Sequence, residues 1–129
     1  MSNAIAQEIV LNASPKRVYD ILLDSKQFSE FTEGIPAQIN CDAGGAFSCF
    51  AGMITGRNVE LIPGQRIVQA WRAGNWPEGI YSIVKFELTV EGSGTKLALH
   101  QSGFPDDSRD HLEIGWQKKY WEPLKKYLG

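Results

Sequence analysis

Two polar side chains interrupt the apolar side of the longest helical pattern in the sequence. In the run Ser108 to Leu128, Glu113 and Gln117 lie four residues apart within the apolar arc and therefore share one helical face. Burying either group without a partner would cost roughly 2–7 kcal/mol. Two interpretations follow. Either the start of the helix overhangs the sheet and both side chains reach water, or this face borders a cavity in which they orient an amphipathic ligand.

The histidines offer little for catalysis. His100 alternates onto the polar side of a strand pattern, and His111 falls in the first turn of the last helix. Neither has a serine, cysteine or carboxylate at a spacing that would form a nucleophile–base arrangement. We therefore predict that both are solvated surface residues and that the protein is not an enzyme.

Acidic and cysteine residues do not form a metal-ligand pattern. Asp106, Asp107 and Asp110 crowd the start of the last helix, where the helix dipole favours negative charge, and no glycine turn or spaced ligand set accompanies them. Cys41 and Cys49 lack a Cys-x-x-Cys spacing and are predicted to be reduced, half-buried strand residues. No phosphate-binding glycine motif occurs. We expect no metal and no cofactor.

An aromatic residue occupies the tip of a predicted loop, Asn75-Trp76-Pro77-Glu78-Gly79. In one interpretation Trp76 folds back over the mouth of a cavity. In the other it contacts a partner or gates the cavity, because binding residues are frequently carried on loops that a rigid scaffold positions.

Composition limits the class of protein. The 129 residues are 43% hydrophobic and 22% charged with a formal charge of -2, which predicts one globular domain over residues 1–129 and no nucleic-acid partner. No run of about 18 apolar residues could span a membrane, and no signal region opens the chain, so we expect a cytoplasmic location. The oligomeric state is left open.

The elements that must position these residues follow from periodicity and breaks. A first strand from Ile5 to near Asn12 precedes two short helices, one from Ser14-Pro15 and one over Ser25 to Thr32. The later candidate strands are Ala37–Cys41, Ala46–Ile54, Arg57–Ile62, Arg66–Arg72, Ile80–Glu91 and Thr95–Ser102, with one break at Gly56. Short connections imply an antiparallel sheet. The prediction is an α+β fold in which a curved sheet of about six to seven strands grips the long C-terminal helix.

Such an arrangement leaves a space between helix and sheet. In β alternation Trp71 points inward with Ile67, which puts Gln69 on the same side, and Pro123 should bend the last helix. The predicted ligand-binding residues of the cavity are Phe31, Phe47, Gln69, Trp71, Trp76, Phe86, Glu113, Trp116, Gln117 and Tyr120. For each aromatic member, packing in the core is the competing interpretation.

The order of elements resembles the helix-grip (START-like, SRPBCC) superfamily over nearly the whole chain. Three segments resemble a narrower family, named after the activator of the ninety-kilodalton heat-shock chaperone's ATPase (AHSA-type): Arg66 to Trp71, Asn75 to Gly79, and Gly115-Trp116 with Tyr120-Trp121. Superfamily relatives bind lipophilic molecules between helix and sheet. Some relatives are enzymes, but their chemistry is not found in these residues.

The resemblance implies two functions. The first is non-enzymatic binding of a small hydrophobic or amphipathic molecule in the cavity between the C-terminal helix and the sheet. The alternative is a co-chaperone-like regulator of the heat-shock chaperone ATPase that acts through its outer surface. In the eukaryotic co-chaperone a separate N-terminal domain precedes this one, whereas Ile5 already begins the first strand here. We therefore expect no appreciable stimulation of the ATPase by this chain alone.

Overall fold

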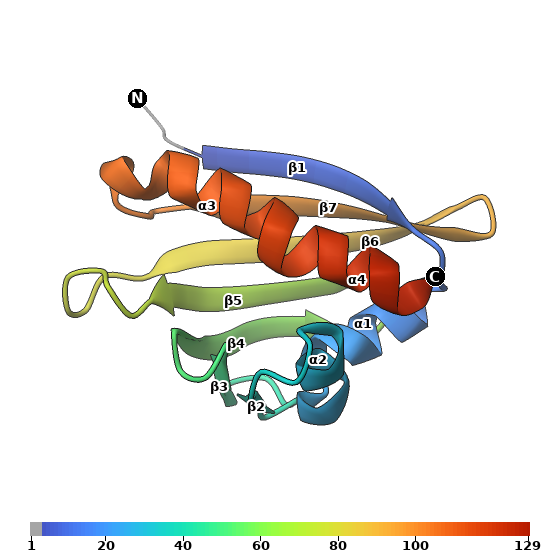
Figure 1. Ribbon diagram of the computed structural model, residues 1–129, viewed down its shortest axis with the longest axis horizontal. Helices are drawn as coiled ribbons and strands as arrows, with labels where there is room; N and C mark the ends of the chain where they lie inside the picture. The colour runs from blue at the N-terminus through green and yellow to red at the C-terminus, as the bar shows by residue number, and fades with distance from the viewer. Residues whose placement is uncertain (1–3) are drawn as a thin grey trace.

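A seven-stranded antiparallel sheet organises residues 4–129, which are the residues that the computed structural model describes (Figure 1). The strands are β1 Ala4–Leu11, β2 Gln38–Ile39, β3 Ala46–Cys49, β4 Ile54–Ile62, β5 Arg66–Ala73, β6 Ser82–Glu91 and β7 Gly94–Ser102. Their order in the sheet is β1-β7-β6-β5-β4-β3-β2, so the first strand pairs with the last. The predicted α+β architecture is confirmed. The prediction of a single domain over 1–129 includes residues 1–3, which lie outside the described residues, and it stays a prediction.

Two short helices follow β1, as predicted. Helix α1 spans Pro15–Leu23 and begins after Ser14, whose hydroxyl accepts a hydrogen bond from the Arg17 amide. Helix α2 spans Ser25–Phe31. It packs against the C-terminal end of the last helix, where the Tyr127 hydroxyl donates to Glu30 at 2.7 Å.

The C-terminal helical run crosses one face of the sheet obliquely (Figure 1). It consists of a 3-10 turn η1 Asp106–Ser108, helix α3 Arg109–Gly115, a π-helical segment η2 Trp116–Trp121 and helix α4 Glu122–Leu128. At the end of η2 the Glu122 amide donates to the Gln117 carbonyl, five residues back. The predicted bend at Pro123 stays a prediction, and the structure adds the π-turn immediately before it.

Strict alternation buries one face of the central strands beneath this helix. On β5, Ile67, Gln69 and Trp71 are buried while Val68 and Ala70 are half-buried on the opposite face. The inward residues of the neighbouring strands are Ser82, Val84, Phe86 and Leu88 on β6 and Thr95, Leu97, Leu99 and Gln101 on β7. A sheet covered by helices on one face produces this pattern.

The predicted break at Gly56 is wrong. The chain turns earlier, at Phe50, Ala51 and Gly52, which all have positive φ (55°, 57° and 89°). Gly56 instead lies inside β4, where a Cβ would come within 1.8 Å of the Ala70 carbonyl oxygen on the neighbouring strand. Because Phe50 and Ala51 seldom adopt left-handed backbone conformations, local propensity favoured a continuous strand there.

The predicted strand Ala37–Cys41 is shorter than expected. It ends at Ile39, because the Asn40 side chain accepts a hydrogen bond from the Asp42 amide and turns the chain. Cys41 is therefore exposed and outside the sheet, whereas Cys49 is buried in β3. The prediction of a half-buried strand position is wrong for Cys41.

Candidate functional site

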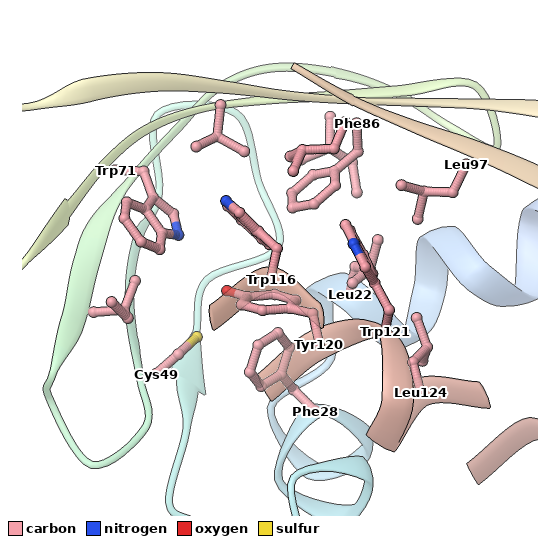
Figure 2. Close-up of a cluster of buried hydrophobic side chains, with 14 of the residues drawn as sticks. Leu22, Phe28, Cys49, Trp71, Phe86, Leu97, Trp116, Tyr120, Trp121 and Leu124 are labelled. Atoms are coloured by element: carbon pink, nitrogen blue, oxygen red, sulfur yellow. The ribbon is translucent and has the colours of Figure 1, made fainter. Parts of the chain in front are cut away.

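Aromatic side chains fill the space between the C-terminal helix and the middle of the sheet (Figure 2). The Tyr120 ring lies 4.4 Å from that of Trp116 and 5.7 Å from that of Phe28, and Phe86 closes the sheet side 5.8 Å from Trp116. Phe31 packs 4.7 Å from Phe28. The ligand cavity predicted at this position is therefore occupied by core side chains, which is the competing interpretation of the aromatic set.

A small void remains inside this core. Its volume is about 10 Å³, close to the space needed for one water molecule. Its walls include Phe47, Gln69 and Phe86, all predicted to bind a ligand. Gln69 has its own partner, because its amide donates to the Asn58 side chain at 3.1 Å, and Asn58 in turn donates to the Asn40 carbonyl at 2.8 Å. The buried amide is thus satisfied within the sheet.

An open hollow of about 820 Å³ lies at one end of the sheet instead. There the first half of the C-terminal helical run faces β4, β5, the β3–β4 turn and the β5–β6 loop. Its lining residues are Ile35, Phe50, Met53, Ile54, Trp71, Ala73, Asn75, Trp76, Pro77, Pro105, Asp107, Ser108, His111, Leu112, Gly115, Trp116, Lys119 and Tyr120. Ligand sites in proteins are typically about 300–1,000 Å³. The hollow therefore has the size of a small-molecule site, and it brings together four predicted residues: Trp71, Trp76, Trp116 and Tyr120.

A chain of buried hydrogen bonds fixes Trp116 in the wall of the hollow. Its indole N–H donates to Gln101 at 2.8 Å, and the Gln101 amide donates to the Ser82 hydroxyl at 3.0 Å. Ser82 donates to the Trp71 carbonyl at 2.8 Å. The sequence offered a signal for Gln101, since an amide that continues the apolar alternation of its strand needs a buried partner.

Trp71 and Tyr120 carry polar atoms at the inner wall. The Trp71 indole N–H is buried and has no hydrogen-bond partner among the described residues, a situation that costs about 1–3 kcal/mol. Burial raises the pKa of Tyr120 far above its usual range, the Cys49 sulfur adds to the rise, and the nearby Trp71 side chain opposes it. Figure 2 shows the Tyr120 oxygen directed toward Trp71 and Cys49. The Trp71 N–H thus lies near this oxygen without hydrogen-bonding geometry, and the hydroxyl stays protonated at neutral pH.

Gly115 leaves the helical side of the hollow open. It has ordinary helical angles, φ −61° and ψ −41°, so no backbone strain requires glycine. A Cβ built there would meet no atom within 4 Å. Glycine inside a helix is less favourable than alanine by about 0.5–1 kcal/mol. At this position glycine makes the helix less stable than alanine would, and the missing side chain keeps the hollow open.

Trp76 folds back against the sheet, as in the first of the two interpretations. It is only 6% exposed, and its ring lies 5.7 Å from that of Trp71. The Arg72 guanidinium donates to the Trp76 carbonyl at 2.9 Å and holds the loop in this position. Trp76 therefore forms a wall of the hollow.

Glu113 and Gln117 do not face the hollow, so their predicted cavity-facing position is wrong. Gln117 is exposed, and the half-buried Glu113 carboxylate lies 3.4 Å from Arg109 Nε. Four of the buried residues, Leu112, Trp116, Tyr120 and Leu124, follow one another at intervals of four, and Trp121 is buried beside Tyr120. A π-turn holds one residue more than an α-turn, so η2 keeps these residues aligned and displaces Gln117 to the border of the arc. Water reaches both polar groups, as in the overhanging-helix interpretation.

Polar side chains lie at the mouth of the hollow. Asp107, His111 and Lys119 are exposed and line its rim, while His100 is exposed on β7. Within residues 4–129 no three histidine, cysteine, aspartate or glutamate side chains are grouped so that they could hold a metal ion. None of the helices in this part of the chain has the length and apolar character needed to cross a membrane.

A long helix laid across a seven-stranded antiparallel sheet, with two short helices after the first strand, defines the helix-grip class of proteins. Residues 12–129 match the family described as Activator of Hsp90 ATPase homolog 1-like protein. The chain belongs to this family.

Curated relatives of the chain include proteins from human and Dictyostelium discoideum. The human activator of 90 kDa heat shock protein ATPase homolog 1 is 29% identical over 116 residues, which cover 90% of this chain and 34% of that protein. The Dictyostelium discoideum homologue is 34% identical over 113 residues, covering 87% of this chain and 29% of the relative. The chain thus spans about a third of the length of these curated relatives.

Solved structures share the whole architecture. The crystal structure of an HSP90 activator from Plasmodium falciparum has a TM-score of 0.86 and 26% identity, covering 100% of this chain and 96% of the other. A Chromobacterium violaceum protein has a TM-score of 0.78 and 28% identity, covering 98% and 97%.

Proposed function

We propose that this chain is a co-chaperone-like regulator of the 90 kDa heat-shock chaperone ATPase. The observation that carries the proposal is its membership, over residues 12–129, of a family described as an activator of that ATPase. The family is described as an activator and not as a catalyst, which supports a regulatory, non-enzymatic role. A heat-shock chaperone as partner and a cytoplasmic location belong to this proposal.

One end of the sheet is suited to contact the chaperone. Met53 in the β3–β4 turn and Ile80 and Tyr81 in the β5–β6 loop are 56%, 39% and 50% exposed. Both connections lie at the same end of the sheet (Figure 1), and the Gly74 amide joins them by donating to the Met53 carbonyl at 2.7 Å. Exposed apolar groups that gather in one area mark interaction sites. We assign this end as the chaperone-contacting surface.

Titration of the chaperone from the same host tests the proposal. We expect saturable binding, and Tyr81→Ala should weaken it about tenfold, as loss of an aromatic contact near an interface centre does. Val90→Ala, which removes a 72% exposed side chain at the β6–β7 end, is the matched control and should bind like wild type. Absence of saturable binding up to ~100 μM would refute the proposal, since a Kd weaker than that leaves little affinity for regulation.

The ATPase rate is measured in the same titration. The expectation that this chain alone does not raise the rate appreciably stays a prediction. A several-fold stimulation would contradict that expectation and support the regulatory function directly.

A second candidate function is binding of a small hydrophobic or amphipathic molecule in the hollow. The supporting observation is the combination of its volume, its aromatic walls and the open space in front of Gly115. Native mass spectrometry of protein purified from its own host should show a retained molecule that Gly115→Leu, which places a large side chain in the hollow, does not retain. Retention of the same molecule to the same extent by wild type and by Gly115→Leu would contradict this function.

A further inference from the structure

The face of the sheet turned away from the C-terminal helical run exposes apolar side chains near the end that we assign to chaperone contact. On β6, Ser82 and Val84 are buried, so strand alternation directs Ile83 to the outer face, where it is 47% exposed. Tyr81, which precedes β6, is 50% exposed, and the Arg72 guanidinium carbon lies 5.7 Å from the centre of its ring. A cation over an aromatic face is a favourable contact, so this area combines apolar and cationic groups.

Small residues flank Ile83 on the outer face. The strand register pairs it with Ala70 of β5 on one side and with Ser102 of β7 on the other. Beyond Ala70, β4 contributes Arg57, which is exposed. Because its neighbours are shorter, Ile83 projects above this part of the sheet and is accessible to a partner. The residues that we call the outer-face patch are Arg57, Arg72, Tyr81 and Ile83.

The two arginines of the outer-face patch form no ion pair with a carboxylate within residues 4–129. Their guanidinium groups donate to backbone carbonyl oxygens instead, at 3.0 Å for Arg57 and at 2.9 Å for Arg72. Glu60 and Glu87, on neighbouring parts of the outer face, both pair with Arg66, at 3.2 and 3.3 Å. The whole chain has a formal charge of -2, so the positive charge of the patch is a local feature.

The chemistry of the outer-face patch selects the charge of a partner. Guanidinium groups bind carboxylates in a planar, bidentate geometry. A basic segment would meet the arginines with like charge, and an uncharged segment would remove water from them without supplying a counter-charge. An acidic segment that also carries apolar side chains compensates both kinds of group.

We propose that the outer-face patch docks an acidic segment of the chaperone, whose carboxylates pair with Arg57 and Arg72 while an apolar side chain packs on Ile83 and Tyr81. This inference rests on the co-chaperone function proposed above. It extends the contact from the end of the sheet onto the outer face and adds the charge of the chaperone segment.

Two substitutions at Arg57 test the charge of that segment. The chaperone from the same host is titrated into this chain, fluorescently labelled, at about 0.05 M salt with anisotropy as the readout. Arg57→Gln should weaken binding about fivefold, the upper value for an exposed ion pair. Arg57→Glu should weaken it about fivefold further, because the acidic segment repels the new carboxylate. A partner without charge at this point would bind the two variants equally.

Matched controls lie at the other end of the same outer face. Lys96 pairs with Thr89 of β6, which places it roughly 20 Å from Ile83. Lys96→Gln and Lys96→Glu make the same changes in charge there, and both should bind within about twofold of wild type. Ile83→Ala should weaken binding about fivefold through the lost apolar contact. Val10→Ala, which shortens a 56% exposed side chain beside Lys96, should bind like wild type.

High salt separates the two parts of the contact. At about 0.5 M salt wild type and Arg57→Gln should differ by less than about twofold, because the charges are then screened over a few ångströms. The loss in Ile83→Ala should persist, since salt does not screen the burial of apolar surface.

The proposal is overturned if Arg57→Glu binds as tightly as Arg57→Gln or more tightly, or if the Lys96 variants weaken binding as much as the Arg57 variants. Wild-type affinity of Ile83→Ala also overturns it, and that result does not depend on the folding of either Arg57 variant. Absence of saturable binding by wild type refutes the co-chaperone function and this inference together. Binding that Tyr81→Ala weakens but that no substitution at Arg57 or Ile83 changes refutes only the docking of an acidic segment.

Discussion

Replacing Gly115 by alanine should make the protein more stable. The residue has helical backbone angles, and the added methyl group would meet no atom within 4 Å. The gain is then the difference in helix propensity, about 0.5–1 kcal/mol, with no steric cost to oppose it. For a chain of this size the expected rise in Tm is roughly 2–5 °C.

Urea denaturation followed by tryptophan fluorescence measures this change, with calorimetry for Tm. The midpoint should rise at a constant m value, because the surface exposed on unfolding hardly changes. Gly94→Ala is the matched control, since its Cβ would lie 2.2 Å from the Leu11 carbonyl oxygen of the neighbouring strand. The same chemical change should therefore destabilise the sheet at Gly94 and stabilise the helix at Gly115.

A neutral or destabilising Gly115→Ala would refute the reasoning. It would mean that the π-helical segment beginning at Trp116 requires glycine before it, or that the hollow is closed at this point in solution. In either case Gly115 could no longer be described as a residue that keeps the hollow open at a cost in stability.

Three further predictions concern the buried parts of the chain. Gln101→Leu should lower the free energy of unfolding by about 1–3 kcal/mol, because the Trp116 indole N–H loses its acceptor; a loss below about 0.5 kcal/mol in urea would contradict this. Gly56→Ala should lower the free energy of unfolding by about 3 kcal/mol or more, because its Cβ clashes with the Ala70 carbonyl oxygen. If the variant melts at the same temperature as wild type, β4 and β5 can move apart at little cost, and the reasoning is wrong. Burial raises the pKa of Cys49 from 9.0 to about 12, so the thiol of the unfolded chain ionises first. The stability that the buried, protonated Cys49 thiol gives to the folded state is fully present below pH 9 and is lost at about 1.4 kcal/mol per pH unit toward pH 12. Cys49→Ala should reduce the fall of the free energy of unfolding with pH in this range, and an unchanged fall would contradict the assignment of this pKa to Cys49.

Periodicity and local breaks predicted most of the architecture. The Ser14-Pro15 start of α1, the shared inward side of Ile67, Gln69 and Trp71 and the long C-terminal helical run depend on neighbours in sequence, and the structure confirms each. The predictions fail where the structure depends on a residue that is close in space but distant in sequence. Gly56 is glycine because the Ala70 carbonyl on another strand approaches it, and a sequence pattern cannot distinguish that reason from a turn.

The candidate site was predicted only in part. Trp71, Trp116 and Tyr120 were selected as aromatic residues on inward faces and Trp76 as the aromatic residue at a loop tip, and the four do meet at one hollow. Phe86 was selected for the same reason but lies in the filled core, because inward direction alone does not show how far neighbouring rings close the space. The π-turn had no distinct signal in the sequence, because a spacing of four residues is also ordinary on one face of an α-helix.

The sequence by itself determined which elements form and which of their faces are apolar, because propensity, capping and alternation act over a few residues. Only the tertiary structure decided where empty space remains. The helix is laid obliquely across the sheet, so its aromatic residues close the middle, while Gly115 and the loop of Trp76 leave the hollow at one end. Volumes between elements depend on their relative placement, and this placement results from the packing of side chains far apart in the chain.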